Sequence, residues 1–197
     1  MAGVTVYGPA MSTAVSRVLA CLLEKDVPFQ LVAVDLAKAQ HRSPDFLKIQ
    51  AESRAICRYI CDKYAEKGNK GLLGRKEGGF VERAWVEQWL EAESQNFNPP
   101  SSALVLQLAL GPIEKNEGKL AKVLDVYERR LGESRFLAGD DFSLADLSHL
   151  PNCHYIISAT DRGHLFASRK NVGRWWEEIS SRPSWKKVVE MQSSPPS

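Results

Sequence analysis

The fold is decided by residues 4–36, which read VTVYGPAMSTAVSRVLACLLEKDVPFQLVAVDL. The β-branched and aromatic run Val4–Tyr7 predicts a short strand, which a Gly-Pro pair ends. From Ser12 onward, apolar residues recur at the spacing of an amphipathic helix, and the run Phe29–Leu36 predicts a second strand. A strand, a helix and a strand within about 30 residues form a βαβ unit, so we expect the two strands to be parallel.

The rest of the chain divides into a short helical segment, a linker and a long helical part. A second amphipathic helix is expected to end at Gly68. The Gly-rich and charged stretch 69–79 is the expected linker. Residues 80–197 show helical periodicity, with an interruption expected at Pro99-Pro100. The predicted fold class is therefore α/β over residues 1–68, followed by an all-α domain over residues 80–197.

One helix start in the second half carries a specific signal. In Asp-Phe-Ser-Leu-Ala-Asp, residues 141–146, Ser143 precedes Asp146 by three positions, which is the spacing of a capping box. Such a start stabilises a helix by roughly 1–2 kcal/mol. We therefore expect Asp146 to have a structural role.

Composition excludes several classes of protein. Lys and Arg number 26 and Asp and Glu 24, so the net charge of +2 is too small to predict a nucleic-acid partner. No apolar run approaches the ~20 residues that cross a bilayer, so no membrane association is expected. The four cysteines are scattered without zinc-site spacing, which predicts buried small hydrophobes and no metal. A reducing cytosol fits this cysteine usage.

Five stretches, in the expected order, resemble a phi-class glutathione transferase of plants. They are MAGVTVYGPAMSTAVSRVLACL, ESRAICRYICDKYAEKGNKGLL, KLAKVLDVYE, LAGDDFSLADLSHLPN and RPSWKKVVEM. The resemblance implies a thioredoxin-like N-terminal domain, a helical C-terminal domain and a homodimer. It also implies an enzyme that joins glutathione, as co-substrate, to small hydrophobic electrophiles in detoxification and the stress response.

The resemblance also assigns the catalytic residue. In the family, the Ser of the Met-Ser-Thr segment hydrogen-bonds the glutathione sulfur, and this segment maps onto Ser12 here. A hydroxyl at a helix start can stabilise a thiolate without acting as a base, because the helix dipole adds to its hydrogen bond. The alternative is that Ser12 is a plain N-cap. Met11 is expected beside an electrophile pocket between the domains.

The remaining glutathione contacts are carried over in two pairs. His41 and Arg42 map onto the residues that hold the glycine carboxylate, with Arg in place of the more common Lys. Glu52 and Ser53 map onto the pair that holds the γ-glutamyl end. Glu⁻ suits the glutamyl ammonium, and a hydroxyl with first-turn amides suits its carboxylate. The alternatives are a solvated loop for the first pair and an ordinary helix start for the second.

One part of the family pattern is missing. The family has a β-hairpin with a cis-proline between its second and third helices, whereas here Gln50 runs through Ala51 directly into Glu52. Two strands and a turn, roughly 15 residues, are absent. This leaves two further hypotheses beside the enzyme: a non-catalytic carrier of small apolar ligands, and an inactive truncated isoform.

Overall fold

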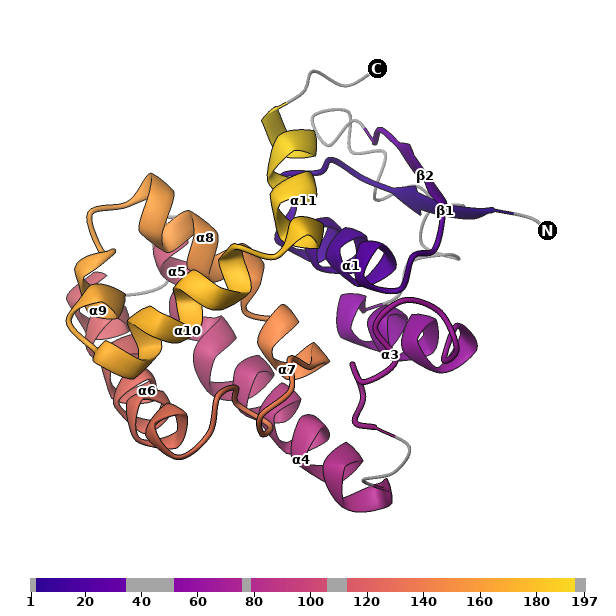
Figure 1. Ribbon diagram of the computed structural model, residues 1–197. Coiled ribbons are helices and arrows are strands. Elements are labelled where there is room, and N and C mark those ends of the chain that lie inside the picture. The colour runs from indigo at the N-terminus through magenta and orange to yellow at the C-terminus, as the bar shows by residue number, and fades with distance from the viewer. Residues whose placement is uncertain (1–2, 35–51, 76–78, 106–112, 194–197) are drawn as a thin grey trace. The chain divides into compact units, whose positions relative to one another are not determined.

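The computed structural model describes residues 3–34, 52–75, 79–105 and 113–193, and the chain divides into two compact units (Figure 1). The first unit combines Met1–Lys70 with Pro183–Ser197, and the second is Gly71–Arg182.

The first unit begins with the predicted βαβ arrangement. Strand β1 (Val4–Tyr7) pairs in parallel with β2 (Phe29–Val32) along its whole length, and helix α1 (Thr13–Glu24) connects them. The parallel pairing is confirmed. Among the described residues these two strands form the sheet of this unit. The predicted end of the second strand at Leu36 lies outside the described residues.

Helix α3 (Ser53–Lys63) packs along α1. Buried cysteines meet between the two helices: Sγ of Cys21 lies 3.7 Å from the carbonyl oxygen of Cys57 and from Sγ of Cys61. The other apolar residues buried on these helices include Val18, Leu19, Leu22 and Ile60. This packing holds the N-terminal ends of two helices in one unit, and those ends carry three of the predicted site residues.

The segment after α3 is anchored to the end of α1. The buried ammonium of Lys25 donates to the backbone oxygens of Ala65 and Asn69, at 3.3 and 2.8 Å. Gly68 has φ of +47°, and a Cβ there would lie 2.3 Å from the carbonyl oxygen of Glu24, so glycine is required. The helix itself ends at Lys63 and not at Gly68 as predicted, because this loop packs back onto α1.

The C-terminal helix α11 (Pro183–Ser193) belongs to the same unit and lies beside α1 (Figure 1). Its Trp185 is buried, and Ser184 donates a hydrogen bond to the Glu24 carboxylate. Gln192 donates to the hydroxyl of Ser16 at 3.0 Å. Helical periodicity over residues 80–197 does not reveal that α11 groups with the first unit. The linker predicted over residues 69–79 stays a prediction.

The second unit is helical. Its elements are α4 (Gly79–Ala92), a π-helical segment (Glu93–Phe97), α5 (Asn98–Val105), α6 (Ile113–Glu133), α7 (Leu144–Leu147), α8 (Leu150–Ala159), α9 (His164–Ala167) and α10 (Lys170–Ser180). Helix α6 packs against α5 and α10 around buried aromatic rings. Tyr127 of α6 lies edge-to-face with Trp89 and Trp175.

The predicted interruption at Pro99-Pro100 takes the form of the π-helical segment. Prolines have no N–H to donate to the carbonyls four residues earlier, so an α-helix cannot run regularly through this point. The wider turn over Glu93–Phe97 precedes the prolines, and α5 continues after it.

The predicted capping box is confirmed and is part of a larger network. Oδ2 of Asp146 accepts hydrogen bonds from the backbone N–H and the hydroxyl of Ser143, both at 3.0 Å. Oδ1 accepts from the N–H of Leu137 at 3.0 Å and from Nε1 of Trp175 at 2.9 Å. Asp146 is fully buried, and burial raises its carboxyl pKa against the lowering effect of these four bonds.

Candidate functional site

Ser12 is the N-cap residue of α1. Its backbone is extended, with φ −66° and ψ 128°, and its carbonyl accepts the first helical hydrogen bond from Ser16 at 2.8 Å. The half-buried side chain makes no capping hydrogen bond. The hydroxyl is therefore not used to start the helix. It stands where the amides and dipole of α1 favour a negative charge.

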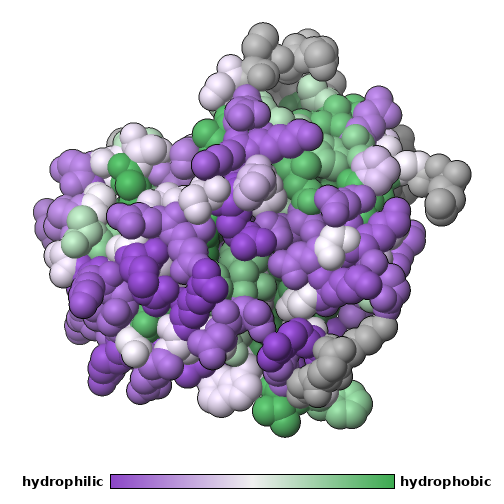
Figure 2. Space-filling model, viewed as in Figure 1, coloured by the Kyte–Doolittle hydropathy of each residue, from purple (hydrophilic) through white to green (hydrophobic). Residues whose placement is uncertain are grey.

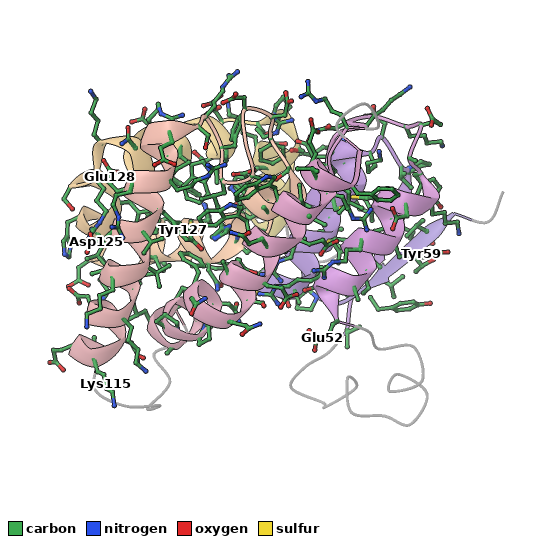
Figure 3. All side chains as sticks on the ribbon, turned by 90° about the horizontal axis from the view of Figure 1, so that it is seen from below. Glu52, Tyr59, Lys115, Asp125, Tyr127 and Glu128 are labelled. Atoms are coloured by element: carbon green, nitrogen blue, oxygen red, sulfur yellow. The ribbon has the colours of Figure 1, made fainter. Side chains whose placement is uncertain are left out.

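Glu52 and Ser53 stand at the start of α3. Glu52 is the N-cap residue, exposed, and its carboxylate makes no capping hydrogen bond. Figure 3 shows Glu52 at this end of the helix. Ser53 is the first helical residue and is buried. An exposed carboxylate thus lies next to a buried hydroxyl and the first-turn amides of α3.

Arg17 links the two helix starts and was not predicted as a site residue. It lies on α1 five residues beyond Ser12, about 7.5 Å along the helix axis. Its buried guanidinium donates from Nη1 to Oγ of Ser53 at 2.8 Å. The available signal was its place four residues before Cys21, on a face of α1 that is otherwise apolar.

The other predicted site residues are divided between described and undescribed parts of the chain. Met11 is described and its side chain is exposed. His41 and Arg42 lie outside the described residues, as does the junction around Gln50 where the hairpin is missing. The described part of the site therefore comprises the start of α1, the start of α3 and the arginine that connects them.

The cysteines lie in the interior, as the sequence predicted. All four are free and buried, and the Sγ atoms of Cys21 and Cys61 are 3.7 Å apart between α1 and α3. Hydrogen bonding to Cys57 and Cys61, together with burial, raises the pKa of the Cys21 thiol, which makes it a poor nucleophile. Within the described ranges, no group of three or more His, Cys, Asp and Glu residues could hold a metal ion.

His149 has a structural role in the second unit. Its Nδ1 lies 2.7 Å from the carbonyl oxygen of Ala145, and its Nε2 lies 2.9 Å from the hydroxyl of Tyr127. Both groups are buried among aromatic rings in the second unit, where Figure 3 shows Tyr127. Burial raises the pKa of Tyr127, so its phenol stays protonated and neutral.

Comparisons with known proteins identify relatives over nearly the whole chain. Residues 112–183 match the family described as glutathione S-transferase, C-terminal domain. Glutathione S-transferase F10 of Arabidopsis thaliana is 41% identical over 216 aligned residues, which cover 97% of this chain and 98% of the relative.

Solved structures are also similar to this chain over nearly its whole length. Glutathione transferase F2 from Populus trichocarpa matches with a TM-score of 0.91 and 58% identity, covering 97% of this chain and 99% of that one. Glutathione S-transferase I from maize, in complex with an atrazine glutathione conjugate, matches with a TM-score of 0.84 and 31% identity, covering 98% and 100%. In the part of the chain that the structure describes, no helix combines the length and hydrophobicity needed to cross a membrane.

Proposed function

This chain belongs to the glutathione transferase family, in its plant phi class, and we propose that its Ser12 hydroxyl holds the glutathione thiolate during transfer to electrophiles. Its fold is a thioredoxin-like N-terminal domain with a helical C-terminal domain, and its activity is conjugation of glutathione. One observation carries the assignment of Ser12: its hydroxyl stands at the start of α1 without capping it. A plain N-cap would use that oxygen for the helix.

The energy required for the chemistry matches what this position can supply. A thiol with a pKa near 8.5 is only about 3% thiolate at pH 7. Lowering the pKa by about 2 units gives about 75% thiolate and needs about 2.7 kcal/mol. A hydrogen bond to a charged sulfur supplies roughly 1.5–3 kcal/mol. The N-terminus of α1 adds about 0.3–1 kcal/mol. The two together are sufficient.

The γ-glutamyl end of glutathione is assigned to the start of α3. The Glu52 carboxylate suits the glutamyl ammonium, while the Ser53 hydroxyl and the first amides of α3 suit its carboxylate. His41 and Arg42 are proposed for the glycine carboxylate at the other end. Met11 is proposed for the electrophile pocket, because its exposed side chain comes directly before Ser12. No metal is needed in this scheme.

We further propose that the hairpin present in the family is missing between Gln50 and Glu52. The alignment with the Arabidopsis relative has 216 positions, more than the 197 residues of this chain, so the relative has residues for which this chain has none. This supports a chain that is shorter than its relative, and we propose that the missing residues lie between Gln50 and Glu52. The expected consequence is weakened glutathione binding, because the backbone of the family hairpin contacts the cysteinyl part of glutathione.

A homodimer in the cytosol is the proposed assembly and location. Three large apolar side chains at the start of α4 support the dimer: Phe80 is 96% exposed, and Val81 and Trp85 are also exposed. Figure 2 shows residues of high hydropathy, in green, at the surface of the face in view. Sedimentation of the unaltered chain and of Phe80→Glu tests this. If Phe80 lies in the dimer interface, the unaltered chain should sediment as a dimer and the variant as a monomer. A monomer for both would contradict it.

Replacing Ser12 tests the proposed catalytic role. Ser12→Ala is expected to lower the rate of conjugation to chlorodinitrobenzene about 100-fold, because it removes a donor to the developing thiolate. The pH–rate profile should move about one to two units to the alkaline side. The matched control is Thr13→Ala, which removes the adjacent hydroxyl from the same helix start.

Two outcomes contradict the proposal. If Ser12→Ala keeps the rate and pH profile of the unaltered chain, Ser12 is only a helix-start residue. If the unaltered chain shows no conjugation but binds apolar dyes, the carrier hypothesis replaces the enzyme.

A further inference from the structure

Arg17 presents a buried charge that the assignment of the glutathione contacts does not use. The guanidinium is 3% exposed and reaches across from α1 to α3, where it donates to Oγ of Ser53 at 2.8 Å. Ser53 is itself buried and is the first residue of α3. Burying an arginine is costly unless polar partners compensate it, and the Ser53 hydroxyl is one such partner.

The bond determines which way the Ser53 hydroxyl can act. A serine hydroxyl has one hydrogen to donate and two lone pairs to accept with. A guanidinium has five N–H donors and no acceptor, so Arg17 can only donate to Oγ. The hydrogen of Ser53 therefore cannot be given to Arg17. It is left for an acceptor elsewhere, and an anion near the first turn of α3 is the acceptor that the positive charge and the helix dipole both favour.

We propose that Arg17 is a positioning residue of the glutathione site, which fixes Ser53 as a donor to the α-carboxylate of the γ-glutamyl residue. The inference rests on the proposed function, because it takes glutathione as the ligand. Arg17 acts through Ser53 and through its charge, without touching the reacting sulfur. It therefore affects the recognition of glutathione and not the ionisation of the thiol.

The geometry allows one ligand to reach both helix starts. Arg17 lies about 7.5 Å along the axis of α1 from Ser12. Two extended peptide residues span about 7 Å. We therefore expect a ligand whose thiol lies at Ser12 to extend along α1 as far as Arg17, whose guanidinium is bonded to Ser53. Selectivity follows from this arrangement, because a thiol peptide without that carboxylate gains nothing from Arg17.

A cycle of variants and ligands tests the proposal. Glutathione and its analogue γ-aminobutyryl-cysteinyl-glycine, which lacks the glutamyl α-carboxylate, are titrated by calorimetry into the unaltered chain, Arg17→Met and Arg17→Lys. Arg17→Met is expected to bind glutathione at least about tenfold more weakly and to bind the analogue within about twofold of the unaltered chain. Arg17→Lys keeps the charge and one donor and should recover part of the loss.

Two further measurements separate positioning from general damage. In steady-state conjugation, Arg17→Met should raise the KM for glutathione and leave kcat within about threefold. Arg58→Met is the matched control, because it removes an arginine from α3 that lies five residues beyond Ser53. It should leave both ligands unaffected. If Arg17→Met does not fold, Arg17→Lys replaces it, with a smaller loss for glutathione and still none for the analogue.

The outcomes distinguish this inference from the proposed function. Absence of glutathione binding by the unaltered chain overturns both. Binding by the unaltered chain that Arg17→Met does not weaken overturns only the role of Arg17. Equal losses for glutathione and for the analogue also overturn it, since they show a structural effect on the whole unit.

Discussion

Asp146→Ala tests the buried polar network around this carboxylate in the second unit. The carboxylate accepts from the N–H groups of Leu137 and Ser143, from the Ser143 hydroxyl and from Nε1 of Trp175. A capping box alone is worth about 1 kcal/mol. The structure adds two buried donors from elsewhere in the chain, and each unsatisfied donor costs about 1–3 kcal/mol. We therefore expect a loss of about 3–7 kcal/mol in the free energy of unfolding.

The assay is urea unfolding followed by circular dichroism and tryptophan fluorescence. The matched control is Asp141→Ala, five residues earlier, where an exposed aspartate pairs with the exposed Arg75 at 3.3 Å. Such surface pairs contribute about 0–1 kcal/mol. Glutathione affinity of Asp146→Ala should hardly change under conditions where it is folded, because the candidate site belongs to the first unit. A loss of 1 kcal/mol or less would refute the reasoning and reduce Asp146 to a simple cap.

Two other perturbations test the first unit. Trp185→Ala should destabilise it by about 3–5 kcal/mol, because the buried indole of α11 belongs to that unit, whereas Gln192→Ala should cost about 1 kcal/mol. In Trp185→Ala, the rate of amide hydrogen exchange should increase more in α1 than in α6. A larger increase in α6 would contradict the grouping of α11 with α1. Restoring a family-type hairpin between Gln50 and Glu52 should strengthen glutathione binding at least about tenfold, since two added hydrogen bonds give ~1–3 kcal/mol. Equal affinities by calorimetry would show the hairpin to be dispensable.

Local patterns in the sequence predicted local structure well. The β-branched run Val4–Tyr7 and the helical spacing after Ser12 predicted strand, helix and parallel strand, and the pairing is confirmed. Ser143 and Asp146 predicted their capping box because its two members lie three residues apart. Each of these signals depends on residues that are neighbours along the chain.

Contacts between distant segments could not be read from spacing. Trp175 donates to Asp146 from 29 positions away, and Arg17 reaches Ser53 across 36. Helical periodicity says which face of a helix is apolar, but it does not say which partner covers that face. The place of α11 beside α1 and the contact of Arg17 with Ser53 therefore emerged only from the packing.

Binding of glutathione to this chain is the measurement that tests the account most directly. Glutathione is titrated by calorimetry into the unaltered protein at two temperatures, so that a binding enthalpy of zero at one of them cannot hide an interaction. The account predicts saturable binding of one glutathione per chain. Ser12→Ala should retain part of this binding and should release fewer protons than the unaltered chain, because it no longer stabilises the thiolate. Absence of binding at both temperatures, by a chain that melts cooperatively, would contradict the central claim that the starts of α1 and α3 form a glutathione site.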